Sequence, residues 1–219
     1  MKVYYGVAAL NHISRFPSDV YICISARMLS KFKITPRSLR RFRGFMIDSG
    51  AFGAYFHGRG FGFDVDEYIA MIERYRPELW ASMDYPCEPH LIDGPPTRDR
   101  IRITVDNAVK IAGKCDRDLL PAFLPVIQGW EIDDYLYCAE LYKEAALVRP
   151  VMGVGSLCRR GSPKKILEIL RELSKALPGV LFHGFGVKLS VLKICDGEAR
   201  NYLHSIDTTA WSFGTGKRR

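Results

Sequence analysis

Acidic side chains follow three separate apolar runs of the chain, each directly after the run ends. Asp48 follows the run FMI, Asp84 follows ASM and Asp207 follows HSI. Two further runs are followed by Gln128 and by Gly155. A carboxyl group can act as a general acid or base, and a glutamine offers both a donor and an acceptor. These residue types indicate a binding or catalytic site, provided that the fold brings the ends of the runs together.

Each of these residues also has a purely structural explanation. An aspartate after a strand is often a helix N-cap or a turn residue. A glycine such as Gly155 can serve only a tight turn, and Gln128 can be an ordinary surface residue. The joint arrangement is harder to explain in this way, because polar residues that end successive strands at one edge are what a binding site needs.

The elements that must position these residues are short apolar runs that alternate with segments of helical period. Eight runs predict strands at residues 3–8, 20–24, 44–47, 79–83, 123–127, 150–154, 180–183 and 204–206. Five segments with helical spacing predict helices at residues 64–75, 97–112, 131–146, 162–176 and 189–202. Strands that are separated by helices indicate parallel βαβ units.

Eight such units predict an α/β fold, a compact (β/α)8 TIM-like barrel formed by a single domain over residues 1–219. The chain is shorter than the roughly 250 residues typical of that fold, so the early helices must be abbreviated. A doubly wound open sheet is the structural alternative. In a barrel, the carboxyl ends of the strands converge on one rim, where active sites lie.

The composition is that of an ordinary globular protein, with 47% hydrophobic and 26% charged residues. No apolar run approaches the roughly 18 residues of a membrane span, and the N-terminus resembles a first strand more than a signal peptide. The six cysteines form no CxxC pair, so we expect reduced thiols in a cytoplasmic protein. Cys87 and His90 have no second pair nearby in sequence, and we therefore expect no metal site.

The excess of basic residues, which gives a net charge of +8, favours polyanionic partners. The segment 31–43 (KFKITPRSLRRFR) interleaves phenylalanines with basic residues that include Arg40, Arg41 and Arg43. Charges can bind phosphates and aromatic rings can stack on bases. The alternative is a solvated helix face with phenylalanines in the core. Further candidates for nucleic-acid contacts are Arg159, Arg160 and the basic tail 214–219, which we expect to be flexible.

Six motifs occur in an order that resembles a known family. The motifs are FMIDSGAFGAY, ASMDYPCEP, PVIQGW, VMGVGSL, HGFGV and SIDTTAW. They look like the ordered motifs of the tRNA-guanine transglycosylase superfamily. The segments GVGSLCRR and DTTAW are more similar to its DNA-modifying branch, the 7-deazaguanine DNA transglycosylases. The resemblance runs from about residue 44 to residue 211.

The resemblance implies roles only where residues match. Asp207 corresponds to the nucleophile and Asp48 to the general acid/base. His183 stands where the family has a methionine on one face of the base. The implied substrate-binding residues are Asp84, Gln128, Gly155, Phe52, Ser49, His183 and Gly184.

The implied activity is that of a pentosyltransferase that replaces guanine in DNA with a 7-deazaguanine, such as 7-cyano-7-deazaguanine, through a covalent Asp–deoxyribose intermediate. It requires no cofactor, and the partners are DNA and the free base; family members often form homodimers. Relatives that modify tRNA carry a zinc-bound Cys/His cluster after the nucleophile strand. The segment after Asp207 contains neither residue type, which favours DNA.

Three alternatives remain open at this point. The first is the same exchange on tRNA, with a partner subunit that supplies RNA binding. The second is a non-catalytic subunit that binds nucleic acid. The third is a hydrolytic glycosidase, in which water replaces the incoming base and the same two carboxylates act.

Overall fold

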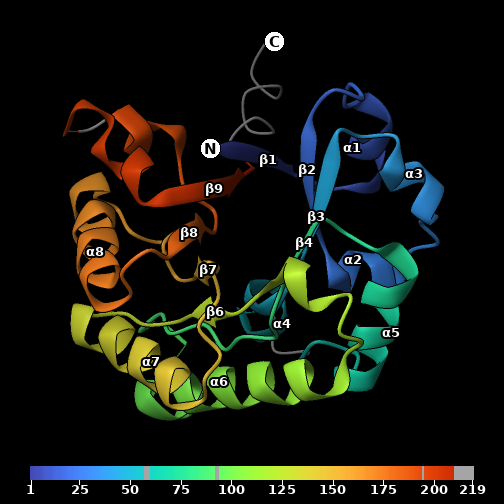
Figure 1. Cartoon of the computed structure of the whole chain (residues 1–219). Helices are drawn as coiled ribbons and strands as arrows, with labels where there is room; N and C mark the ends of the chain where they lie inside the picture. The colour runs from blue at the N-terminus through green and yellow to red at the C-terminus, as the bar shows by residue number, and fades with distance from the viewer. Residues whose placement is uncertain (57–59, 92–93, 194, 210–219) are drawn as a thin grey trace.

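Nine short parallel strands form one sheet that curls around a central axis (Figure 1). The computed structural model describes residues 1–56, 60–91, 94–193 and 195–209; the expected tail at 214–219 lies outside these ranges. The sheet has the order β5-β4-β3-β2-β1-β9-β8-β7-β6. The strands are β1 (Lys2–Gly6), β2 (Tyr21–Ser25), β3 (Gly44–Asp48), β4 (Leu79–Ala81), β5 (Phe123–Leu124), β6 (Val126–Ile127), β7 (Val151–Val154), β8 (Leu181–Gly184) and β9 (Leu203–Thr208).

The fifth predicted strand, at residues 123–127, is divided at Pro125 into two halves with different neighbours. β5 pairs with β4, whereas β6 pairs with β7. Pro125 has no N–H group to donate to a ladder, but its carbonyl accepts from Gly153 N at 2.8 Å. The two ends of the sheet are therefore joined by consecutive residues, and the order is that of a closed barrel. The (β/α)8 prediction is confirmed, and the open doubly wound sheet is excluded.

Hydrogen bonds complete the junction where the two halves meet. Leu124 O accepts from Ser82 N at 2.9 Å, and Val126 N donates to Ser82 Oγ at 3.0 Å. The buried Ser82 hydroxyl thus takes the place of a ladder partner that the break in the strand removes. Buried backbone N–H groups need such partners.

Four of the five predicted helices form at the expected places, and each begins with local signals. They are α5 (Val65–Tyr75), α6 (Thr97–Lys114), α7 (Ile132–Glu144) and α8 (Pro163–Ala176). A reciprocal capping box joins Asp64 and Glu67 at the start of α5. Pro163 occupies the first turn of α8, where its missing N–H costs nothing.

The fifth predicted helix, at residues 189–202, is wrong as an α-helix. The structure has two 3-10 helices there, η2 (Leu189–Lys193) and η3 (Cys195–Asn201). Gly197 adopts a φ of +82°, a left-handed conformation that a continuous right-handed helix does not allow. The chain also forms short helices that the periodicity did not reveal, because each spans too few residues: α1 (Leu10–Arg15), α2 (Ala26–Lys31), α3 (Pro36–Arg40) and α4 (Ala51–Phe56), followed later by the 3-10 turn η1 (Leu120–Ala122).

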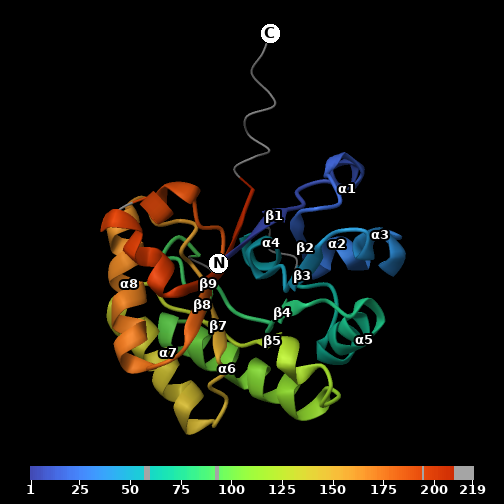
Figure 2. The same ribbon diagram turned by 45° about the horizontal axis from the view of Figure 1, so that its top comes forward.

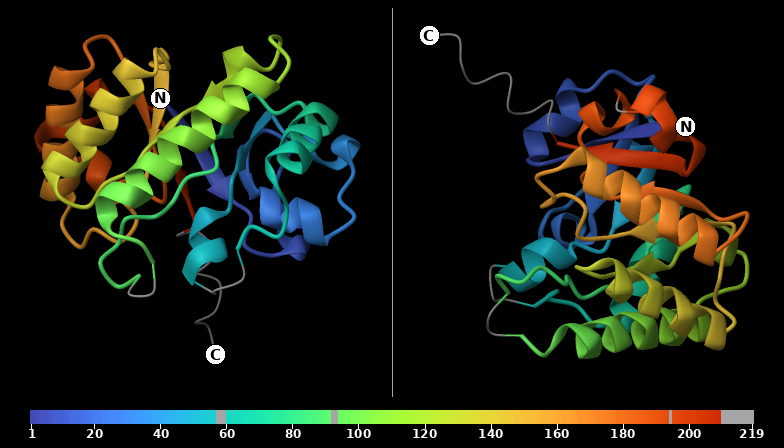
Figure 3. Two further views of the ribbon diagram at one scale, coloured as in Figure 1. Left: turned by 90° about the horizontal axis from the view of Figure 1, so that it is seen from below. Right: turned by 90° about the vertical axis from the view of Figure 1, so that its left-hand side faces the viewer.

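The longer helices form an outer layer around the strands (Figure 2). Figure 3 shows α6, α7 and α8 lying side by side along one flank of the barrel. The apolar face of α8, which includes Ile166, Leu170 and Leu173, is buried against the sheet, whereas Lys164 and Lys165 are exposed. Among the described residues, no helix is both long and apolar enough to cross a membrane.

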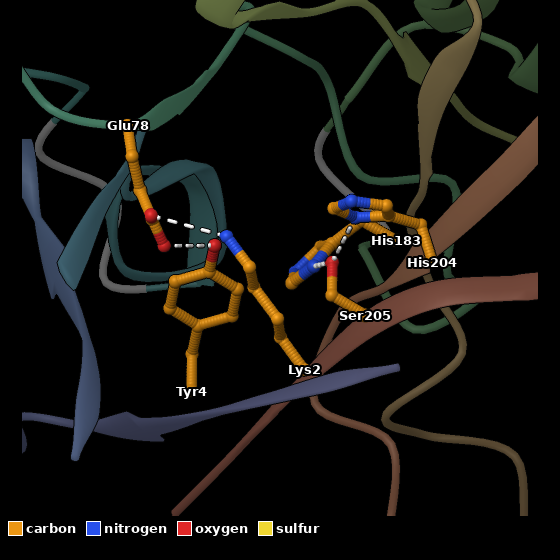
Figure 4. A network of polar contacts seen from close by, with 6 residues as sticks. All are labelled: Lys2, Tyr4, Glu78, His183, His204 and Ser205. Carbon is orange, nitrogen blue, oxygen red and sulfur yellow. Dashed lines mark hydrogen bonds and ion pairs between the residues drawn. The ribbon is translucent and has the colours of Figure 1, made fainter. Parts of the chain in front are cut away.

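A second, smaller apolar cluster fills the barrel interior. Alternate residues of each strand face the axis, and those of the lower part of the barrel pack together: Tyr4, Cys23, Met46, Leu79 and Leu124. Polar groups lie beside this cluster: the Tyr4 hydroxyl donates to Glu78 Oε1 at 2.6 Å, and Lys2 bonds the same carboxylate (Figure 4). The lower part of the interior is thus packed, and a cavity lies toward the carboxyl ends of the strands.

Replacing Ser82 with alanine tests whether the junction at Pro125 depends on its hydroxyl. Ser82→Ala leaves the buried Val126 N–H without an acceptor, so we expect a loss of about 1–3 kcal/mol in the free energy of unfolding. Urea denaturation followed by circular dichroism measures it. Ser14→Ala, on an exposed face of α1, is the matched control and should change stability by less than about 0.5 kcal/mol. Equal stability of the two variants would contradict this role of Ser82.

Candidate active site

The three aspartates singled out from the sequence reach one cavity at the carboxyl ends of the strands. Asp48 lies two residues after Met46 on β3 and Asp207 two residues after Ser205 on β9, so both face the barrel axis. The cavity has a volume of about 550 Å³. It is lined by Asp48, Ala51, Phe52, Asp84, Pro86, Glu88, Gln128, Gly155, Ser156, Cys158, Arg159, Phe185, Gly186, Lys188, Asp207, Thr208 and Thr209.

A chain of hydrogen bonds holds the buried Asp84 carboxylate. Ser49 Oγ donates to Asp84 Oδ1 at 2.8 Å, and Gln128 Nε2 donates to Asp84 Oδ2 at 2.5 Å. Ser156 Oγ in turn donates to Gln128 Oε1 at 2.8 Å. Burial raises the pKa of Asp84, and the bonds from Ser49 and Gln128 oppose that rise. The chain fixes the orientation of Asp84 and Gln128 relative to each other.

The backbone beside this chain is shaped to admit Gln128. A Cβ atom at Gly155 would lie 2.2 Å from Gln128 Nε2, so only glycine leaves room for the amide. The next residue, Ser156, has a φ of +56°, a conformation that is unusual for a residue other than glycine. Such strain tends to persist where surrounding contacts over-determine it, often at functional sites. Here the Ser156 hydroxyl both donates to Gln128 and accepts from Cys87 N at 3.2 Å.

Asp48 is surrounded by groups that disfavour its ionised form. Burial, followed by the negative charges of Asp84 and Asp207, raises the pKa of Asp48 from 3.8 to about 8, although the backbone N–H groups of Gly50 and Ser49 oppose the rise. Gly50 N donates to Asp48 Oδ2 at 3.1 Å. At neutral pH the Asp48 carboxyl group therefore carries its proton, which is the state that a general acid needs.

Asp207 is oriented by its neighbours on two sides. Gly186 N donates to Asp207 Oδ1 at 2.8 Å, and His183 Nε2 lies 3.4 Å from the same oxygen. His183 Nδ1 is in turn 2.8 Å from Ser205 Oγ (Figure 4). Asp207 lines the cavity, so these contacts orient its carboxyl group toward a ligand bound there.

The predicted base contact at His183 does not lie on the cavity wall. Its ring is wholly buried beneath the cavity, against Phe185 and edge-on to Tyr4. Phe185, two residues further along the same face, lines the cavity instead. Gly184 also lies outside the wall, and Ser49 acts through its bond to Asp84. The structure therefore places His183 next to Asp207.

Aromatic and basic side chains gather at the cavity mouth. Phe52, which is 39% exposed, stacks on Phe56 with a centroid distance of 4.1 Å. The Arg159 guanidinium lies 4.9 Å from the Phe52 ring centroid and 5.4 Å from that of Phe56. The Arg160 guanidinium lies 3.9 Å from the ring centroid of Trp130. Phe52 was predicted to contact the base, and Arg159 and Arg160 to contact nucleic acid; Phe52 and Arg159 line the cavity, whereas Arg160 is not among its lining residues.

The basic segment at 31–43 lies away from this mouth. Arg43 directly precedes β3 and its guanidinium packs over Tyr21 at the start of β2, whereas Asp48 ends β3. Arg40 is exposed near the same end of the strands. Arg41 bonds the carbonyls of Ile13 and Phe16. The structure thus does not bring Arg40, Arg41 and Arg43 together with the cavity.

No group of three or more His, Cys, Asp or Glu side chains suited to hold a metal ion occurs among the described residues. Cys87 is buried, with its sulfur 3.6 Å from the Tyr85 carbonyl oxygen. His90 is exposed and its ring lies near those of Phe56 and Trp130. The two side chains therefore have different surroundings.

Sequence reasoning missed several residues of the cavity wall. Phe185 could have been found by extending the two-residue period of β8 one residue past its end, because it continues the face of His183. Ser156 adjoins the predicted Gly155. Glu88 and Lys188 lie on loops, where no periodicity signals the direction of a side chain.

Comparisons with solved structures show the barrel fold and no more. A crystal structure of phosphonopyruvate hydrolase complexed with oxalate and Mg²⁺ has a TM-score of 0.55 and 14% identity, covering 99% of this chain and 78% of that chain. A putative lyase/mutase from Burkholderia cenocepacia has a TM-score of 0.52 and 15% identity, covering 97% and 78%. A 2,3-dimethylmalate lyase of the PEP mutase/isocitrate lyase superfamily has a TM-score of 0.52 and 12% identity, covering 98% and 77%.

The sequence itself matches one family model over nearly its whole length. No curated protein matches the chain significantly. The model named DpdA, described as DeoxyPurine in DNA protein A, matches residues 3–219, which include the whole cavity wall. The match confirms the expected resemblance to the DNA-modifying branch, and the description supports a role in the modification of deoxypurines in DNA. The chain belongs to the DpdA family, DeoxyPurine in DNA protein A.

Proposed function

We propose that this protein is a base-exchange transglycosylase that replaces guanine in DNA with a 7-deazaguanine. The observation that carries the proposal is the pairing, in one cavity, of Asp48, whose pKa burial raises to about 8, with an Asp207 carboxyl group oriented by Gly186. A proton donor and a nucleophilic carboxylate are what two successive displacements at a sugar carbon require.

In the first displacement, an Asp207 oxygen attacks C1′ of the deoxyribose. The C1′–N9 bond breaks and its electron pair leaves with guanine, while Asp48 transfers its proton to the departing base. The products are a covalent Asp207–deoxyribose ester, a neutral guanine and an ionised Asp48. An aspartyl ester of this kind divides one difficult step into two easier ones.

In the second displacement, the incoming deazaguanine loses its N9 proton to ionised Asp48. The N9 electron pair then attacks C1′, and the bond from C1′ to Asp207 breaks with its electrons returning to the carboxylate. The configuration at C1′ is retained after two inversions. Asp48 is protonated again at the end of the cycle, so the reaction needs no cofactor.

Base recognition would come from other polar residues of the cavity wall. Asp84 and Gln128, linked to each other, line the same cavity as Gly155 and offer acceptors and donors to the polar edge of a purine. The rings of Phe52 and Phe185 line the same cavity and can stack on a flat base.

The polymer would reach the cavity only with one nucleotide extruded, because a duplex hides both C1′ and the base edge. Unstacking one base costs a few kcal/mol. Arg159 and Lys188 at the cavity can offset this cost through phosphate contacts. The more remote Arg40, Arg41 and Arg43 would add contacts only if the DNA also runs past the opposite end of the strands.

Asp207→Asn tests the nucleophile. An amide oxygen is a far weaker nucleophile than a carboxylate oxygen, so incorporation of labelled guanine into single- or double-stranded DNA should fall below detection. Asp106→Asn, on the exposed side of α6, should leave the rate unchanged. Near wild-type exchange by Asp207→Asn would contradict the assignment. If the wild-type protein incorporates guanine into tRNA but not into DNA, the tRNA alternative is favoured. If the wild-type protein releases guanine from DNA without incorporating the labelled base, hydrolysis is favoured.

Asp48→Asn tests the general acid and its elevated pKa. We expect exchange to fall by about 10² or more, and wild-type kcat/KM to decline above about pH 8, where Asp48 ionises in the free enzyme. Between about pH 4 and pH 8 the native state keeps a proton that the unfolded state has lost, so stability decreases as pH rises.

The matching stability measurement compares the thermal unfolding of wild type and Asp48→Asn from pH 4 to pH 9. Because asparagine cannot ionise, the variant should gain stability relative to wild type as pH rises through this window. Asp106→Asn controls for the loss of a surface carboxylate. A difference between Asp48→Asn and wild type that does not change with pH would contradict the raised pKa.

Arg159→Ala tests the polymer contact at the cavity mouth. Loss of one phosphate contact should weaken binding of a fluorescent oligonucleotide and lower the slope of log K against log salt concentration by about 1. The double variant Arg40→Ala/Arg43→Ala measures the remote segment in the same anisotropy titration. An unchanged slope for Arg159→Ala, together with a reduced slope for the double variant, would move the interface to the opposite end of the barrel.

A further inference from the structure

Glu88 is a buried carboxyl group that the proposed reaction does not use. It lines the active-site cavity and is only 1% exposed. Its Oε2 atom has no hydrogen-bond partner in the part of the chain that the structure describes. Burial of a carboxyl oxygen without a partner is unfavourable, so the position needs an explanation other than stability.

The loop that carries Glu88 is held by Arg100, whose hydrogen bonds go to backbone carbonyl oxygens and not to the Glu88 carboxyl group. The buried Arg100 guanidinium donates to the carbonyl oxygens of Pro95 at 2.6 Å, Glu88 at 3.2 Å and Pro86 at 3.5 Å, and also to that of Leu91. These bonds fix the backbone of the loop. Among the residues described, no lysine, arginine or histidine forms an ion pair with the Glu88 carboxylate.

The Asp84 and Gln128 side chains of this wall, unlike Glu88 Oε2, already have partners. Each Asp84 oxygen accepts a bond, from Ser49 and from Gln128. Both ends of the Gln128 amide are also engaged, with Asp84 and Ser156. Glu88 Oε2 is therefore a buried acceptor on a cavity-lining residue for which the described residues supply no donor.

We propose that Glu88 binds an N–H group of the exchanged base and so selects bases that carry a hydrogen-bond donor, most strongly a cationic one. This inference rests on the proposed function and names the substrate class of the same cavity. A carboxylate accepts hydrogen bonds and pairs best with a charged donor. A substituent that can only accept, such as a nitrile, gains nothing from it.

Two positions on a 7-deazaguanine can supply the donor: the 2-amino group of the Watson–Crick edge, and an aminomethyl substituent at position 7. Four free bases separate these sources. Guanine and hypoxanthine differ in the 2-amino group. The 7-aminomethyl and 7-cyano forms of 7-deazaguanine differ in whether the substituent donates or only accepts.

The experiment measures the affinity of each base by isothermal titration calorimetry for wild type, Glu88→Gln and the control Glu168→Gln, which changes an exposed residue of α8. Within one of the two pairs, we expect Glu88→Gln to weaken binding at least tenfold for the base that carries the donor facing Glu88. For the other base of that pair, which lacks this donor, binding should weaken by less than about threefold. The control should resemble wild type. The pair whose two bases respond differently to Glu88→Gln shows whether the 2-amino group or the substituent at position 7 faces Glu88.

Thermal unfolding of the ligand-free proteins separates a binding role from a structural one. Because no partner bond of Glu88 Oε2 is lost, the melting temperature of Glu88→Gln should be equal to or higher than that of wild type. A lower melting temperature with equal weakening for all four bases would overturn the proposal, as would unchanged affinities. If wild type binds none of the four bases, the proposed function itself fails. If wild type binds them and Glu88→Gln binds them equally well, only the role of Glu88 fails.

Discussion

The hydrogen-bonded pair of Asp84 and Gln128 is the interaction on which the rest of the site depends. It allows a carboxylate to be buried at the top of the barrel, because Ser49 and Gln128 supply the donors that water would otherwise provide. Burial, followed by the charge of Asp84, then raises the pKa of Asp48. Asp84, whose two oxygens both accept hydrogen bonds, thus influences the protonation of Asp48. Different surroundings give these similar carboxyl groups different roles.

Backbone features of the barrel make that pair possible. The break at Pro125 turns the chain from β4 toward β7 and is followed three residues later by Gln128. Gly155, at the end of β7, leaves the space that the Gln128 amide fills, and the strained Ser156 aims its hydroxyl at the same amide. We infer that strand closure and substrate recognition depend on the same short stretch of chain.

The sequence predicts the barrel and the three aspartates because both rest on local patterns. Short apolar runs mark the strands, and the residue after each run must lie at the rim. The split at Pro125 follows from a residue type that could have been read as a ladder break. Glu88 could not have been assigned to the cavity, because its direction depends on the bonds of Arg100 to a loop without periodicity. The place of His183 beneath Asp207 depends on strand register, which a sequence motif alone does not specify.

The measurement that tests the central claim most directly is peptide mapping of the enzyme trapped on DNA. Wild-type protein would be mixed with an oligonucleotide in the absence of incoming base, denatured and digested, and the peptides analysed by mass spectrometry. The account predicts a DNA-derived deoxyribosyl mass on the peptide that contains Asp207, and none on the peptides that contain Asp48 or Asp84. A deoxyribosyl group on Asp48, or active exchange in which no protein adduct forms at all, would contradict the assignment of Asp207 as the nucleophile.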